Sequence, residues 1–105
     1  TAAEVIAAVE KAENAGERFD LSGIEGFMNE VGYTFLSQER GAEAIEALAF
    51  NVARFPNSPN AHDSLGEALF EAGKLTEARE QYAKVLELDP GNDNATRMLS
   101  RIDQS

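Results

Sequence analysis

The sequence contains no cysteine, a single histidine and few basic residues. The absence of cysteine excludes a disulfide framework, a thiolate metal site and a cysteine nucleophile, and it leaves the redox compartment undetermined. Nine Lys and Arg stand against nineteen Asp and Glu, which gives a net charge of −10. A chain of this charge repels phosphate backbones and anionic lipid. We therefore expect neither a nucleic acid nor a membrane surface as partner.

Long apolar runs are also missing. No stretch is long enough to cross a membrane, and no basic start followed by an apolar segment marks a signal peptide. The chain has 105 residues, of which 43% are hydrophobic and 27% charged, so it suits one globular domain. Because the first residue is Thr1 and not Met, we expect the chain to be processed or cut from a longer protein.

An internal repeat with a period of 34 residues dominates the sequence. The offset aligns identical residues in the middle and the later part of the chain: Gly32 with Gly66, Glu43 with Glu77, Ala44 with Ala78, Glu46 with Glu80, Ala49 with Ala83, Pro56 with Pro90, Asn60 with Asn94, Ala61 with Ala95, and Leu65 with Leu99. Apolar residues also pair with apolar residues at this offset, as Val31 does with Leu65. The two repeats cover approximately residues 25–58 and 59–92.

Within each repeat the apolar positions recur at helical spacing, so each unit is predicted to form two helices joined by a short turn. In the first helix of the first unit these positions are Phe27, Met28, Val31, Phe35 and Leu36. Ser22 and Glu25 have the spacing of a capping box, and Gly73 is placed to end the first helix of the second unit. A further helix over residues 93–103 is predicted to cap the array.

The N-terminal residues do not repeat. Residues 1–15 show the pattern of an amphipathic helix with an apolar stripe at Val5, Ile6 and Val9, and residues 16–22 are predicted to be a loop before a repeat domain over residues 23–105. The loop would let this helix fold into the groove of its own chain or of a second copy.

The period, with small residues where helices approach one another and a proline closing each unit, resembles the tetratricopeptide repeat. The small residues are Gly32 and Gly66 in the first helices and Ala44 and Ala78 in the second. The resemblance covers residues 25–103 and implies an all-α helical-hairpin array: two full repeats, a C-terminal capping helix and the N-terminal amphipathic helix.

A narrower resemblance concerns the run Asn51–Ser58 and the run Asp63–Ala68 that follows it. Together these runs look like the tetratricopeptide tail that follows the catalytic domain of some bacterial serine hydrolases, of the β-lactamase-like and esterase kinds. The resemblance implies an accessory domain whose enzyme lies upstream of Thr1.

No pattern for catalysis is present in the chain itself. It has no Gly-x-Ser-x-Gly elbow and no Ser-x-x-Lys motif. His62 and Asp63 are adjacent, but the repeat places His62 at a packing position, and residues 89–93 lack the ligand spacing of a calcium loop. We expect a protein that is not an enzyme, with no catalytic residue, no cofactor and no metal site.

A binding surface remains. The resemblance implies a concave groove lined by the first helices, which in this family holds peptides or partner helices. The groove positions are Asn29, Tyr33, Ser37, Asn60, Asp63, Glu67, Phe70, Asn94, Arg97 and Arg101. Asp63 and Glu67 favour a basic group on the ligand, and the Lys, Asn and Arg that clamp a C-terminal carboxylate in some family members are absent from the first two units. The hypothesis is a module that binds a protein or peptide; the alternative is a self-associating accessory domain, a homo-oligomer in which the N-terminal helix fills the groove.

Overall fold

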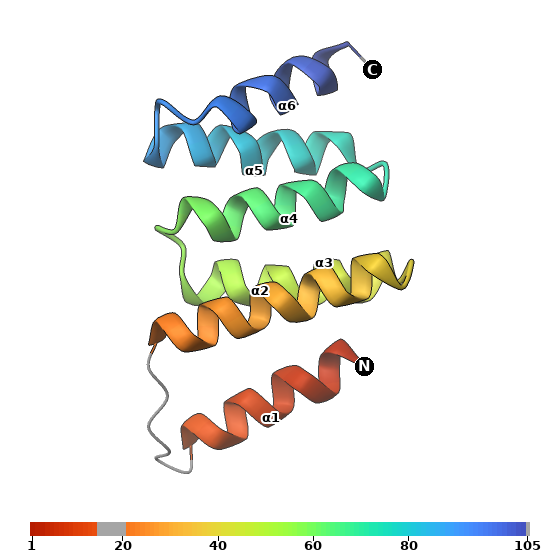
Figure 1. Ribbon diagram of the computed structural model, residues 1–105, viewed down its shortest axis with the longest axis vertical. Helices are drawn as coiled ribbons and strands as arrows, with labels where there is room; N and C mark the ends of the chain where they lie inside the picture. Colours follow the sequence, from red (N-terminus) through yellow and green to blue (C-terminus); the bar gives the residue numbers. More distant parts are fainter. Residues whose placement is uncertain (15–20, 105) are drawn as a thin grey trace.

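The computed structural model describes residues 1–14 and 21–104, which form six α-helices and, within these ranges, no strand. The helices are α1 (Ala2–Asn14), α2 (Leu21–Ser37), α3 (Gly41–Arg54), α4 (Pro59–Glu71), α5 (Leu75–Leu88) and α6 (Asp93–Asp103). They stack along the long axis of the molecule, with α1 at one end and α6 at the other (Figure 1). The predicted all-α array of helical hairpins is confirmed. Among the described residues, no helix has the length and apolar character needed to span a bilayer.

Each repeat is a hairpin of two closely packed helices, α2 with α3 and α4 with α5. The two turns share one geometry, in which a residue in the left-handed region follows the first helix. It is Gly73 in the second repeat (φ 78°) and Glu39 in the first (φ 59°). The next amide bonds back to the helix in both turns, from Arg40 to the Phe35 carbonyl (2.8 Å) and from Lys74 to the Leu69 carbonyl (2.9 Å). This hydrogen-bond pattern ends a helix sharply and reverses the chain.

Close approach within each hairpin depends on a glycine in the first helix. A β-carbon built on Gly32 would lie 2.4 Å from Leu48, and one built on Gly66 would lie 2.9 Å from the ring of Tyr82. Leu48 and Tyr82 are fully buried and come from the second helix of each hairpin. A side chain of α3 or α5 therefore occupies the space that a larger residue would need.

Side-chain caps start the helices that follow the first and second repeats. The Ser58 hydroxyl accepts a hydrogen bond from the Ala61 amide (3.2 Å), and the Asn92 side-chain oxygen accepts one from the Ala95 amide (2.9 Å). The start of α2 differs from the expectation. Because α2 begins at Leu21, residues 21 and 22 are helical although the sequence placed them in a loop. The remaining loop residues lie outside the described ranges.

Glu25 has a role that the capping-box hypothesis did not foresee. Its carboxylate accepts a hydrogen bond from the hydroxyl of Ser58, the cap of α4. Its backbone carbonyl accepts one from the side-chain amide of Asn51, which is fully buried (3.1 Å). Glu25 thus connects α2 to the end of α3 and to the start of α4.

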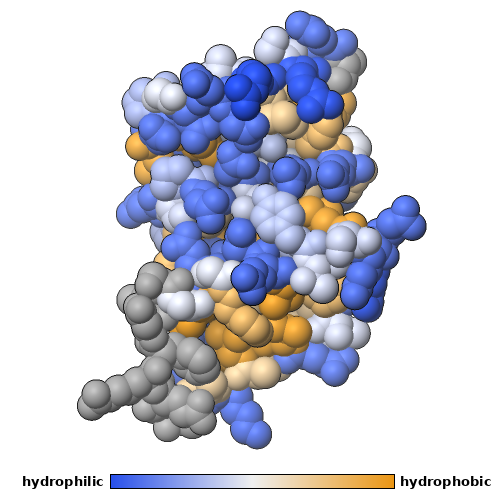
Figure 2. Space-filling model, in the orientation of Figure 1, coloured by the Kyte–Doolittle hydropathy of each residue, from blue (hydrophilic) through white to orange (hydrophobic). Residues whose placement is uncertain are grey.

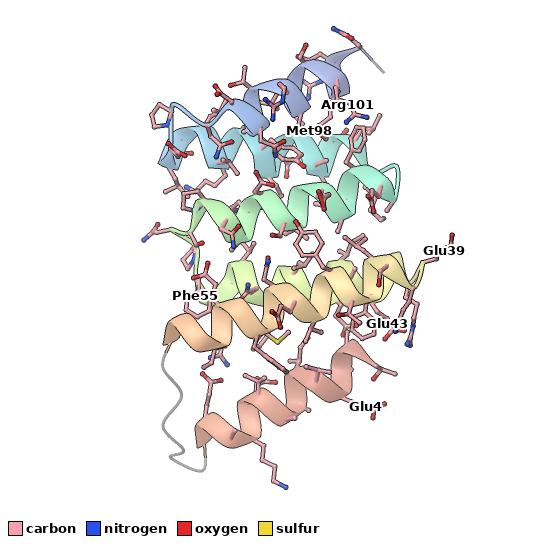
Figure 3. All side chains as sticks on the ribbon, viewed as in Figure 1. Glu4, Glu39, Glu43, Phe55, Met98 and Arg101 are labelled. Carbon is pink, nitrogen blue, oxygen red and sulfur yellow. The ribbon has the colours of Figure 1, made fainter. Side chains whose placement is uncertain are left out.

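The N-terminal helix α1 packs on α3 and runs parallel to it. The Ala2 amide donates to the Glu43 carboxylate at the start of α3 (3.0 Å), and Arg54 at the end of α3 forms an ion pair with Glu13 at the end of α1 (2.5 Å). Figure 3 shows Glu43 beside the N-terminal end of α1. Val9 is buried in this contact.

The hypothesis that the N-terminal helix fills the groove of its own chain is therefore corrected. Helix α1 lies at the opposite end of the stack from α6 (Figure 1) and packs on α3, the second helix of the first repeat. The side-chain contacts described below that join α2 to α4 and α4 to α6 are made by residues of these three helices. The physical reason is the pair of polar contacts at its two ends. These contacts align α1 with α3 while its apolar stripe covers the end of the core.

Candidate interaction surface

Side chains of the three first helices α2, α4 and α6 meet on one side of the molecule, which we call the first-helix face. It comprises Asn29, Tyr33, Asp63, Ser64, Glu67, Phe70, Asn94 and Arg101. Between α2 and α4, the Ser64 hydroxyl donates to the Asn29 side-chain oxygen (2.5 Å), and the Tyr33 phenol and the Glu67 carboxylate interact closely enough to shift each other's pKa. Two side chains spaced one helical turn apart on each helix thus pair across the contact.

Between α4 and α6 the contacts continue in the same direction. The Asn94 side-chain amide donates to the Asp63 carboxylate (3.0 Å). The Arg101 guanidinium lies over the ring of Phe70, 4.9 Å from its centre, and contacts the sulfur of Met98 (3.8 Å). Figure 3 shows Arg101 and Met98 together on α6. A cation at this distance from a ring face is attracted to it.

Acidic groups dominate the electrostatics at the centre of this face. Burial raises the pKa of Glu67 above its usual 4.5, and the nearby carboxylates of Glu71 and Asp63 raise it further, while the bond from Tyr33 opposes the shift. Burial also raises the pKa of the Tyr33 phenol, and the negative charge of Glu67 adds to the effect. Ionised Glu67 is therefore held among groups that disfavour its charge. A cation placed beside it would be stabilised.

The structure brings together seven of the ten residues predicted for the groove and leaves three apart. Ser37 donates its hydroxyl to the Thr34 carbonyl of its own helix (2.8 Å), while Asn60 and Arg97 are exposed side chains on α4 and α6. Their role in binding stays a prediction. The other seven each interact with another residue of the first-helix face.

Two residues near this face, Ser64 and Tyr82, were not among the predicted groove positions. Ser64 is buried between α2 and α4, and Tyr82 reaches from α5 under Gly66. Burial raises the pKa of the Tyr82 phenol strongly, and the negative charges of Asp63 and Glu67 raise it further. The repeat pattern marked Tyr82 as a core residue. Tyr82 is 1% exposed, as a core position requires.

Phe27 also differs from the expectation. It was assigned to the packed face of α2, yet it is 50% exposed and has the largest exposure among the big apolar side chains that the structure describes. The repeat-equivalent residue in α4 is the small Ala61, which is buried. The first repeat therefore exposes a large apolar side chain at a position where the second repeat has a small buried one.

His62 lies in the interior between the helices of the second repeat. Its two ring nitrogens lie 2.7 Å from the Gln81 side-chain oxygen and 2.7 Å from the Pro56 carbonyl oxygen. These contacts hold the imidazole between the start of α4 and the middle of α5. Within residues 1–14 and 21–104, no group of three or more His, Asp or Glu side chains is placed to hold a metal ion.

Comparison with known families assigns this architecture. A family model described as tetratricopeptide repeat matches residues 32–93, which is more than half of the chain. The chain belongs to the tetratricopeptide repeat family. The resemblance inferred from the 34-residue period is thereby confirmed, and repeats of this family are generally non-catalytic modules of protein interaction.

Two known proteins are similar to the chain over part of their length. RNA polymerase II-associated protein 3 of Rattus norvegicus is 49% identical over 64 residues, which are 61% of this chain and 9% of that protein. A solved structure described as the first tetratricopeptide repeat of Spaghetti (RPAP3) bound to the HSP90 peptide SRMEEVD is 30% identical, with a TM-score of 0.72. That match covers 76% of this chain and 64% of the solved chain.

Proposed function

We propose that the chain is a protein-interaction module that binds a peptide segment on the first-helix face, with a basic residue of the peptide beside Asp63 and Glu67. Family membership supports the general role, because the similar solved structure is described with a bound peptide. The observation that carries the specific proposal is the arrangement of Tyr33, Glu67 and Asp63. It gathers two carboxylates and a phenol at the centre of the face.

The charge of each helix supports the choice of a basic ligand. Helices α2 and α4 contain no Lys or Arg, while α4 alone carries Asp63, Glu67 and Glu71. The peptide in the similar solved structure, SRMEEVD, contains three acidic residues. A ligand of that charge would meet carboxylates over the first two repeats of this chain. Like charges at close range across an interface disfavour binding, and opposite charges favour it.

The experiment compares two peptides that differ only in charge, SRMEEVD and SRMKKVD, by fluorescence anisotropy at low and at physiological salt. We expect the lysine peptide to bind about tenfold more tightly or better, which corresponds to about 1.4 kcal/mol. The preference should shrink as salt screens the charges. Tighter binding of the acidic peptide would overturn the assignment of a basic ligand, and no binding of either peptide would count against peptide binding on this face.

A pair of charge-reversal variants tests whether the peptide binds on the first-helix face. Glu67→Lys should weaken binding of the lysine peptide and improve binding of the acidic one. Glu80→Lys makes the same change of charge at an exposed residue of α5 and should leave both affinities within about twofold. Equal effects of the two variants would show that only net charge matters.

Two finer hypotheses from the sequence complete this proposal. Attachment to a bacterial serine hydrolase rests on the runs Asn51–Ser58 and Asp63–Ala68, and it is tested by identifying the full-length protein. Self-association as a homodimer is tested by light scattering behind a sizing column at two concentrations, with and without residues 1–15. A dimer that is lost on removal of these residues would favour exchange of α1 between copies over the monomeric module.

A further inference from the structure

A cleft of about 300 Å³ lies between α1 and α2, apart from the first-helix face. Its apolar lining consists of Val5 from α1 and Phe27, Val31 and Phe35 from α2, and Glu30 and Thr34 complete it. Figure 2 shows an apolar area in the lower part of the molecule, where Figure 1 places these two helices. The half-exposed ring of Phe27 belongs to this cleft.

The internal repeat shows what kind of surface this is. The residues 34 positions after Phe27 and Val31 are Ala61 and Leu65 in α4, which are only 1% and 5% exposed. Helix α3, the second helix of the preceding unit, packs on α4, and α5 packs on α6 in the same way. The corresponding neighbour of α2 would be α1, but α1 packs on α3. The cleft is therefore a helix-packing surface that this chain covers only in part.

The apolar ridge of the cleft has helical geometry. Phe27, Val31 and Phe35 are spaced four residues apart and form one row along α2, and rows of this spacing accept the side chains of a crossing helix. The row lies two residues away from the row of Asn29 and Tyr33, a rotation of about 200° around the helix. The cleft and the first-helix face are thus on opposite sides of α2. A substitution in the Phe27 row therefore leaves the side chains of the Asn29 row in place.

The charge around the cleft distinguishes between occupants. Glu30 is part of the lining and is exposed, and Arg40, which lies over the ring of Phe35, is paired with Glu43. Residues 1–50 as a whole carry three basic and ten acidic residues. A second copy of this chain would bring an equally acidic end to the same place, so like charges oppose a dimer here. A helix with Lys or Arg beside its apolar stripe complements both the apolar row and the acidic border.

We propose that the cleft between α1 and α2 is a second binding site, which takes a basic amphipathic helix of a partner protein. The helix packs its apolar stripe on Phe27 and Val31, as α3 packs on α4, and places a basic side chain beside Glu30. This site goes beyond the peptide site of the first-helix face and does not depend on it.

The probe is a synthetic amphipathic helix of leucine and lysine, compared with a peptide in which glutamate replaces every lysine. Binding is followed by amide chemical shifts of the labelled protein. We expect the leucine–lysine peptide to shift the amides of Val5, Phe27 and Val31 and to bind about tenfold more tightly than the leucine–glutamate peptide. Phe27→Ser should lower the affinity by about tenfold or more, while Glu80→Lys, at an exposed residue of α5, should not change it.

A second pair of variants tests the same site without removing an apolar side chain, in case Phe27→Ser disturbs the fold. Glu30→Lys changes only the charged border and should weaken binding of the leucine–lysine peptide. Glu46→Lys makes the same change at an exposed residue of α3 and should have no such effect. Shifts confined to the first-helix face, or equal binding of both peptides, would overturn the proposal. A mass that doubles with concentration and returns to that of a monomer in Phe27→Ser would assign the cleft to a second copy instead.

Discussion

The ring of Tyr82 lies so close to the backbone of α4 that a β-carbon on Gly66 would sit 2.9 Å from two of its ring carbons. Tyr82 is 1% exposed, so the ring has no free space into which it can move. This one contact sets the distance between α4 and α5.

Gly66→Ala should therefore destabilise the domain although alanine is the better helix former. We expect a loss of about 1–3 kcal/mol in the free energy of unfolding, measured with urea, because the added methyl group forces the two helices apart. Gly26→Ala is the matched control, since nothing lies within 4 Å of a β-carbon there. That variant should gain about 0.5–1 kcal/mol. A Gly66→Ala protein as stable as the wild type would contradict the close contact.

A substitution in the turn between α2 and α3 should stabilise the protein. Glu39 adopts a left-handed conformation that costs a residue with a β-carbon about 1–2 kcal/mol. Glu39→Gly is expected to raise the free energy of unfolding by about 1 kcal/mol, whereas Gly73→Ala in the equivalent turn should lower it by a similar amount. Thermal unfolding of both variants measures the two changes in stability. Effects of the same sign would show that the two turns are not equivalent.

Glu67 should make stability depend on pH. Its pKa is raised by burial and by neighbouring carboxylates, so the folded protein holds this proton more tightly than the unfolded chain does. The stability from this group is complete below the unfolded pKa and is lost as the pH rises through the folded value. We expect Glu67→Gln to be more stable than the wild type at neutral pH, with a difference that disappears at acidic pH. Urea unfolding across this pH range, with Glu80→Gln as control, tests the sign.

Docking of α1 should depend on its buried stripe. Val9 is only 7% exposed, so Val9→Asp places a carboxylate in a buried position. We expect the free energy of unfolding to fall by about 2 kcal/mol and hydrogen exchange in α1 to become faster. Ala8→Asp introduces the same charge at an exposed position of the same helix and should cost less than about 0.5 kcal/mol. Unchanged exchange in Val9→Asp would mean that α1 is not held on α3 in solution.

Much of the architecture follows from local features of the chain. The 34-residue period, the helical spacing of residues such as Leu65 and Leu69, and the small Gly32 and Gly66 together require stacked hairpins, because each of these features constrains neighbouring helices directly. Seven of the ten residues predicted for the groove lie on one side of the molecule, since they occupy equivalent faces of equivalent helices, and their role in binding stays a prediction. The repeat carries such inferences wherever both units bury the same face; Phe27, half exposed where Ala61 is buried, is an exception.

Other features depend on contacts between segments that no local pattern specifies. The apolar stripe of α1 fixed that this helix must dock, but only the bond from Ala2 to Glu43 and the ion pair of Glu13 with Arg54 decided that it docks on α3. This choice leaves Phe27 half exposed and opens the cleft beside α2. The sequence by itself determined the helices, their pairing and the acidic character of the surface; the tertiary structure decided where the unpaired helix lies, because the contacts that hold α1 join residues about 40 positions apart in the chain.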